Sequence, residues 1–229
     1  MIKVIINADD FWISDKFDEA ILELLENKQI TSTTVLVRGC KNKQNINRLM
    51  ELKKKNNVSI WLHFKINWID DYNAIMNELN KQYNSFKNIF GIEPSHIDKH
   101  NRENNKNEVR VMCDFAIEHN LPIRLYTRWK YFKTYEDEYK NKIIMTDKLY
   151  NITSNNYWIK VIKEKIQNDH NDEIWEVICH PGFFDNKYEP AKWGTELNKR
   201  REKDYEDVIE LSKYLKEKNI KTISFLDLK

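Results

Sequence analysis

The chain has 229 residues, and its 38 basic and 36 acidic side chains leave a formal net charge of only +2. This near balance, without a basic tail or patch, gives no reason to expect a nucleic-acid partner. The length suits one large domain with a well-buried core, and the sequence shows no linker or internal repeat, so we predict a single domain over residues 1–229.

Cysteine content and the N-terminus bear on the compartment. Cys40, Cys113 and Cys179 are widely spaced and form no CxxC pair, which fits a reducing compartment. The first apolar run ends at Asn7, too early for a signal peptide or a membrane span. We therefore expect a cytoplasmic protein with no membrane partner. A homodimer is compatible with the sequence, which does not decide the oligomeric state.

Strand-like and helix-like segments alternate along the whole chain. Short β-branched or apolar runs predict strands at 2–6, 33–37, 58–64, 96–98, 122–126, 143–145, 174–179 and 222–225. Apolar residues at helical spacing predict helices around 17–25, 45–55, 72–90, 109–116, 158–166 and 205–215. The stretch 127–142 has no clear period and is expected to form a long loop over the site. This alternation predicts an α/β fold with a parallel sheet of seven or eight strands, either an open doubly wound sheet or a barrel.

The first predicted strand ends in two adjacent carboxylates, Asp9 and Asp10. Neighbouring side chains of a regular strand point in different directions, so one carboxylate can bind a metal while the other reaches a water or a substrate. Bare carboxylates at the rim of a buried strand are costly unless a cation or hydrogen bonds satisfy them. The alternative is a helix N-cap, because a helix follows soon after.

Other chemically capable side chains also occur in or just after predicted strands. They are His63, Asp98, His100, Arg124, Glu176 and His180. Each has a simpler explanation on its own: a core histidine, a turn cap, a charge neutraliser or a rigid turn before proline. Their recurrence at one end of several strands is more informative, because that end of a parallel β/α barrel carries the active site. One Asp with two His is a common divalent-metal set, which predicts metal-assisted hydrolysis of an amide or ester.

Five segments resemble the YdjC-like carbohydrate deacetylases, a family that includes chitooligosaccharide deacetylases. In chain order they are 7–11 (NADDF), 31–34 (TSTT), 62–63 (LH), 96–100 (HIDKH) and 176–182 (EVICHPG). The resemblance implies a single TIM-like (β/α) barrel, a divalent metal ion such as Mg²⁺ or Zn²⁺, and a small N-acetylated sugar as substrate. It implies that the metal ligands are Asp10, His63 and His100.

The resemblance also implies the remaining roles. Asp9 would be the catalytic base and His180 the acid that protonates the leaving amine, with Asp98, Arg124 and Glu176 as supporting groups. Two competing hypotheses stay open at this point. One is a barrel that binds a sugar or metabolite without turning it over, and the other is a metal-dependent hydrolase of a different ester or amide.

Three departures from the family pattern concern the pocket wall. Trp12 stands where the family has glycine, Arg102 stands where it has a second histidine, and Trp68 leads almost directly into the next helix where it has a longer loop. We expect the faces of both tryptophans near the mouth of the site, where aromatic rings pack well on sugars. With the guanidinium of Arg102, which suits a carboxylate or phosphate, they suggest a smaller or acidic sugar. The alternative is that Trp12 packs inward and Arg102 pairs with Asp98 or Glu103.

Overall fold

The computed structural model describes residues 1–39, 42–101, 105–126, 130–152, 157–169, 171–188 and 194–228. Its strands are β1 (Lys3–Phe11), β2 (Ser32–Val35), β3 (Ser59–Phe64), β4 (Ile97–Lys99), β5 (Lys148–Asn151), β6 (Ile174–Cys179) and β7 (Lys221–Thr222). Its α-helices are α1 (Asp15–Glu26), α2 (Lys43–Asn56), α3 (Tyr72–Phe90), α4 (Lys106–Glu118), α5 (Lys130–Lys133), α6 (Glu136–Tyr139), α7 (Tyr157–Asn168) and α8 (Gly194–Glu217). Two 3₁₀ helices, η1 (Asn186–Tyr188) and η2 (Phe225–Leu228), complete the described part.

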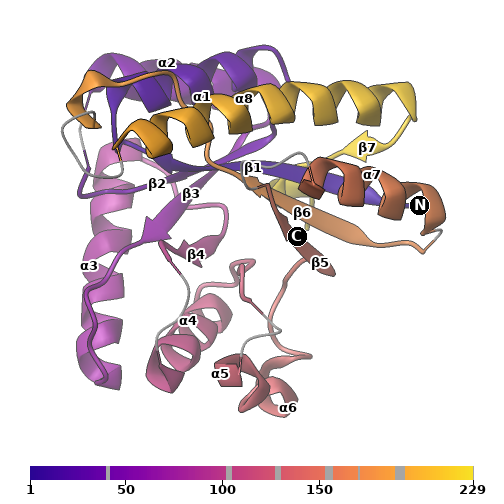
Figure 1. Cartoon of the computed structure of the whole chain (residues 1–229). Coiled ribbons are helices and arrows are strands. Elements are labelled where there is room, and N and C mark those ends of the chain that lie inside the picture. The colour runs from indigo at the N-terminus through magenta and orange to yellow at the C-terminus, as the bar shows by residue number, and fades with distance from the viewer. Residues whose placement is uncertain are drawn as a thin grey trace.

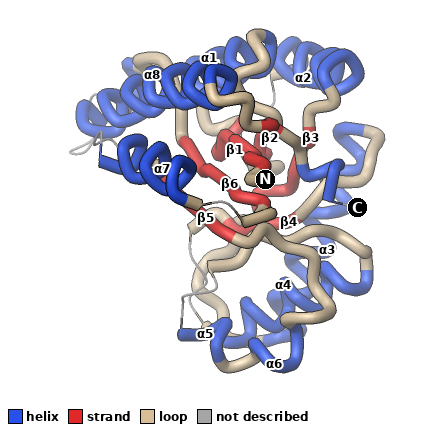
Figure 2. The backbone as a smooth tube through the Cα atoms, turned by 90° about the vertical axis from the view of Figure 1, so that its right-hand side faces the viewer, coloured by secondary structure: helices blue, strands red, loops and turns tan. Residues whose placement is uncertain are grey.

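The strands form one parallel sheet in the order β4-β3-β2-β1-β6-β5. β7 pairs with the first residues of β1. Helices α1, α2 and α8 lie together on one side of the sheet, and α4, α5 and α6 lie on the other (Figure 1). The view along the strands shows the helices arranged around them (Figure 2). Because all these strands run in the same direction, the residues that follow them collect at one end of the sheet, which places the site.

The predicted α/β class and parallel sheet are confirmed, but the closed barrel of seven or eight strands is wrong. The sheet is a half-barrel of parallel strands. Beyond β4, the predicted strands at 122–126 and 143–145 contribute only the isolated bridges Ile97–Ile123 and Pro122–Ile144. A proline lacks the backbone N–H that a ladder needs, and so short a run gains little from pairing. The last predicted strand, at 222–225, overlaps β7 only at Thr222, and its last residue, Phe225, begins η2.

The helix predictions were more accurate than those for the later strands. α3 carries the expected apolar stripe, begins at the N-cap Asp71, whose side chain accepts from Ala74 N at 2.7 Å, and ends at Gly91 with φ 65°. The predicted loop at 127–142 instead contains α5 and α6, with 127–129 outside the described residues. No helix in the described ranges is long and apolar enough to cross a membrane.

Candidate active site

β1 ends in an irregular segment that brings Asp9 and Asp10 to the same site. The register between β1 and β2 shifts between Ala8 and Phe11, and Asp10 has φ 76°, in the left-handed region. Thr34 of β2 holds the segment, accepting from Asp10 N at 3.3 Å and donating to Asp9 Oδ1 at 3.2 Å. An oxygen of each carboxylate lies within 4.8 Å of a ring nitrogen of His63. The two carboxylates have separate partners, since Asp9 is held by Arg124 and Asp10 contacts His100 and Arg201.

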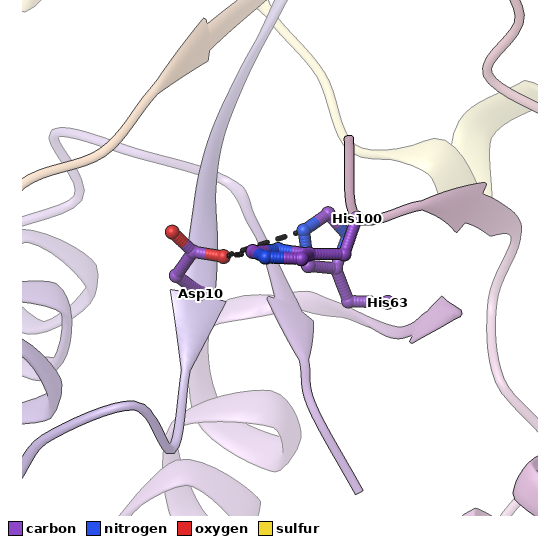
Figure 3. Close-up of side chains that lie close together, drawn as sticks. All are labelled: Asp10, His63 and His100. Atoms are coloured by element: carbon purple, nitrogen blue, oxygen red, sulfur yellow. Dashed lines mark hydrogen bonds and ion pairs between the residues drawn. The ribbon is translucent and has the colours of Figure 1, made fainter. Parts of the chain in front are cut away.

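Asp10, His63 and His100 form a compact group at the ends of three strands (Figure 3). Asp10 Oδ1 lies 3.4 Å from His63 Nε2 and 3.0 Å from His100 Nδ1. Although burial opposes ionisation, the hydrogen bonds from the two histidines and the charge of Arg201 hold the pKa of Asp10 well below its ordinary value. One carboxylate oxygen and two imidazole nitrogens thus converge, as the ligands of a divalent ion do.

His63 is oriented by a second carboxylate behind it. Its Nδ1 lies 2.6 Å from Asp98 Oδ1, which leaves Nε2 directed at Asp10. Metal-binding histidines are commonly fixed in this way, with the other ring nitrogen donating to a carboxylate. Burial opposes protonation, but Asp98 and Asp9 raise the pKa of His63 to about 10. A site whose carboxylates draw a proton onto a buried imidazole favours positive charge, so this donor set fits a divalent cation.

A second group of potential ligands, Asp9, His63 and Asp98, lies alongside the first. Its carboxylates are already neutralised by a guanidinium, because Arg124 Nη1 donates to Asp9 Oδ2 at 2.8 Å and also to Asp98 Oδ2. A cation there would face the guanidinium directly. Arg124 contacts both carboxylates of this second group, whereas Arg201 contacts only Oδ2 of Asp10 and leaves Oδ1 to the two histidines, so the group of Asp10, His63 and His100 is the better metal site.

Arg124 joins three buried carboxylates beneath the site. Besides Asp9 and Asp98, it donates from Nε to Glu176 Oε1 at 2.6 Å. Burial opposes its charge, but these carboxylates hold the pKa of Arg124 well above its ordinary value. Burial raises the pKa of Asp9, but Arg124, His63 and His180 together outweigh it and the net pKa is lowered. At Glu176 burial dominates and raises the pKa to about 7. Asp9 is thus held as a charged, oriented carboxylate, and Glu176 is partly neutral.

His180 approaches the same oxygen of Asp9 that Arg124 Nη1 contacts. Its Nε2 is 3.8 Å from Asp9 Oδ2, and its side chain is 34% exposed. Burial lowers the pKa of His180, and the charges of Asp10 and Asp9 offset only part of this effect. Its backbone N–H donates to Asp204 Oδ2 at 2.9 Å, and its Nδ1 lies 3.8 Å from the same oxygen.

Two residues of α8 belong to the site and were missed in the sequence. Arg201 Nη2 donates to Asp10 Oδ2 at 2.6 Å, and Asp204 holds the His180 backbone. Burial raises the pKa of Asp204 to about 7. The sequence did indicate that these two residues are buried, since both continue the helical spacing of the apolar stripe formed by Val208, Leu211 and Leu215. Charges on the buried side of a helix are rarely there without a partner.

The structure corrects the prediction for Trp12. Its side chain is fully buried and stacks on Phe90 with ring centroids 5.3 Å apart, so it forms core rather than the mouth of the site. Its φ of 81° explains why glycine suits this position. The backbone is held there by Asp18 Oδ1, which accepts from Trp12 N at 2.6 Å. The inward-packing alternative is the correct one.

Trp12→Ala should lower the free energy of unfolding by about 3–5 kcal/mol, the usual cost of emptying a buried aromatic site. Trp12→Gly should lower the free energy of unfolding by about 1 kcal/mol less than Trp12→Ala does, because glycine adopts the left-handed conformation without strain. Urea denaturation followed by circular dichroism measures both. Trp68→Ala is the matched control: Trp68 is 74% exposed and its loss should change stability by less than about 0.5 kcal/mol. Native stability in Trp12→Ala would contradict the buried placement.

The other predicted pocket residues have different outcomes. Trp68 is exposed in the loop that leaves β3, at the same end of the sheet as His63. Arg102 and Glu103 lie outside the described residues, so the predicted guanidinium in the pocket wall stays a prediction. A small cavity of about 150 Å³ opens beside His180, and Ile152, Leu197 and Asp204 are among its lining residues.

A parallel β/α half-barrel with an Asp–His–His group at its strand ends, beside an ionised Asp and a third His, defines a protein with a candidate metal centre. A family model described as YdjC-like protein matches residues 3–217, and the chain belongs to the YdjC-like family. A carbohydrate deacetylase from Clostridium beijerinckii is 26% identical over 260 residues, covering 99% of this chain and 100% of that protein. A chitooligosaccharide deacetylase from Escherichia fergusonii is 26% identical over 215 residues, covering 80% of this chain and 82% of that protein.

The fold has a solved counterpart. A crystal structure of an Enterococcus faecalis protein, proposed to cleave cellobiose phosphate, superposes with a TM-score of 0.76 at 22% identity, covering 99% of this chain and 98% of that one. This similarity supports the α/β half-barrel and its connectivity.

Proposed function

We propose that the chain is a metal-dependent hydrolase that removes the acetyl group from a small N-acetylated carbohydrate. One observation carries this most strongly: His63 Nε2 and His100 Nδ1 converge on one oxygen of Asp10, with Asp9 and His180 beside them. This arrangement holds the groups that amide hydrolysis needs, and the curated relatives named above are carbohydrate deacetylases.

Asp10, His63 and His100 would hold the metal. When bound, the ion supplies Lewis-acid polarisation of the acetyl carbonyl and makes water more acidic. Asp98 fixes the His63 ring so that Nε2 faces the site, where a bound cation would displace the Nε2 proton. His100 comes from the segment just after β4, where its backbone N–H donates to Phe64 O at 2.8 Å, so two adjacent strands fix the spacing of the two imidazoles.

Asp9 is suited to the role of general base. Its Oδ1 accepts from Asn7 Nδ2 at 2.6 Å and from Arg124 Nη2 at 3.0 Å, so the carboxylate cannot rotate freely. Its Oδ2 accepts from Arg124 Nη1 and lies on the side of His180. Within the described residues Oδ2 has this one hydrogen-bond donor, so it keeps a lone pair that can take a proton from an attacking water, and the cationic guanidinium moderates the charge of the carboxylate.

His180 is suited to protonating the leaving amine. It stands across from Asp9, partly open to solvent, so a departing amine can reach it. Its lowered pKa keeps the ring neutral near pH 7, so it must collect a proton before it can donate one. The hydrogen bond from its backbone N–H to Asp204 fixes the position of the His180 backbone, from which the ring extends.

The proposal predicts acetate release from N-acetylated sugars that stops when a chelator is added. The native chain should be assayed on N-acetylglucosamine, its short β-1,4-linked oligomers and an acidic N-acetyl sugar, with acetate and free amine both quantified. An acetate ester and a simple acetamide serve as competing substrates. Turnover of the ester or the acetamide without turnover of any sugar would favour a different hydrolase. Absence of turnover with sugar binding intact would favour a non-catalytic sugar-binding barrel.

A further inference from the structure

Arg201 makes a long-range contact with the candidate metal site. It lies on α8, 191 positions along the chain from Asp10, yet its Nη2 is 2.6 Å from Asp10 Oδ2 with its side chain only 6% exposed. Its guanidinium lies 4.2 Å from the centre of the Phe17 ring. A Cβ on Gly182 would approach Arg201 Cδ to 3.1 Å and Phe17 Cδ1 to 2.4 Å, so the β6 loop closes over the same side chain. The guanidinium is therefore fixed by neighbours from three segments.

This placement of Arg201 lowers the stability of the fold. Arg201 Nε and Nη1 have no hydrogen-bond partner within the described residues, although both are buried. An arginine with unpaired buried N–H groups lowers the stability of the fold, and such groups in a native structure usually have a functional reason. The Phe17 ring offsets part of the cost through its π face, but that contact would stabilise the arginine equally well without Asp10.

The contact with Arg201 limits how Asp10 can bind a cation. Its two oxygens have separate partners, with Oδ1 directed at His63 and His100 and Oδ2 held by Arg201. To bind a cation with both oxygens, Asp10 would have to break its contact with Arg201. A guanidinium this close also repels the cation, because the site is buried and weakly screened.

We propose that Arg201 is a positioning residue that restricts Asp10 to one oxygen toward the metal, at a cost in metal affinity, and so keeps a coordination position for the substrate. This rests on the proposed function, since it takes Asp10, His63 and His100 as the ligands. If Arg201 only supported the structure, its removal would loosen the site and weaken metal binding instead of strengthening it.

The test is titration of the metal-free full chain with Co²⁺, followed by calorimetry and by visible absorption, which reports the coordination number. Arg201→Met removes the charge and the N–H contact with Asp10 but keeps an unbranched side chain. We expect it to bind Co²⁺ about tenfold or more tightly, with an altered absorption spectrum, and to release acetate about 10- to 100-fold more slowly. Arg201→Lys keeps the charge, so its affinity should stay closer to the native value. Lys199→Met, an exposed substitution on the same helix, is the control and should match the native chain.

Weaker or unchanged Co²⁺ binding in Arg201→Met, or tighter binding with the native spectrum, would overturn the positioning role. The native chain and Asp10→Ala separate this from the proposed function. If the native chain binds Co²⁺ and releases acetate, and Asp10→Ala does neither, the function stands whatever Arg201 does. If native binding is absent or survives in Asp10→Ala, the metal site and the inference fall together.

Discussion

His100→Ala should lose acetate release and weaken metal binding by more than about 100-fold, because it removes one of three convergent ligands. His100 is the sharper choice for this test. Its side chain is 20% exposed, so water can fill the space left behind, whereas His63 is fully buried and its removal leaves Oδ1 of the buried Asp98 without its imidazole partner. A chelator should abolish native activity, and a divalent ion added back should restore it. Metal content by atomic emission and acetate release are the measurements.

His119→Ala is the matched control for this loss. His119 caps α4 and packs against the rings of Tyr83 and Phe115, so its removal should leave metal content and turnover unchanged. Circular dichroism should show that both variants keep the native helix content. Full metal occupancy in His100→Ala and in His63→Ala together would remove these residues from the metal site.

The elements with strong local patterns could be predicted from the sequence. β1, β3 and β6 are continuous buried runs, and α3 has both an unbroken apolar stripe and a glycine cap. β5 was missed because it has only four residues, all half-buried, and its two hydrophobic residues are adjacent and so do not alternate with polar ones. Its place depends on pairing with β6, a long-range interaction that local pattern does not contain.

In the candidate site, too, some residues could be predicted from the sequence and others could not. Residues that follow buried strands were found because parallel strands bring their ends together, which is why Asp10, His63, Asp98 and His180 lie close to one another. The bulge at Asp10 was not foreseeable, since nothing in an Asp-Asp pair specifies a left-handed φ. Arg201 was missed because helix spacing shows that it is buried but not which of the distant carboxylates it meets.

Asp9→Asn should slow acetate release by about 100-fold or more, the usual contribution of a positioned general base, and leave metal affinity near the native value. The amide keeps the shape of the carboxylate but cannot take a proton from water. It also places an NH₂ group near Arg124, which retains Asp98 and Glu176 as partners. The fold should therefore survive, and metal binding should too, because Asp9 is not among the proposed ligands.

Two controls separate lost base catalysis from a disturbed Arg124 network. Asp172→Asn makes the same chemical change at a carboxylate whose side chain is 78% exposed, and should have no effect. Glu176→Gln removes another carboxylate partner of Arg124 without touching the side of Asp9 that faces His180. Because burial already raises the pKa of Glu176 to about 7, the neutral amide resembles its partly protonated state, and turnover should fall far less than in Asp9→Asn. Near-native turnover in Asp9→Asn would show that Asp9 is not the base. An equal loss in Glu176→Gln would show that Asp9 acts through the Arg124 network.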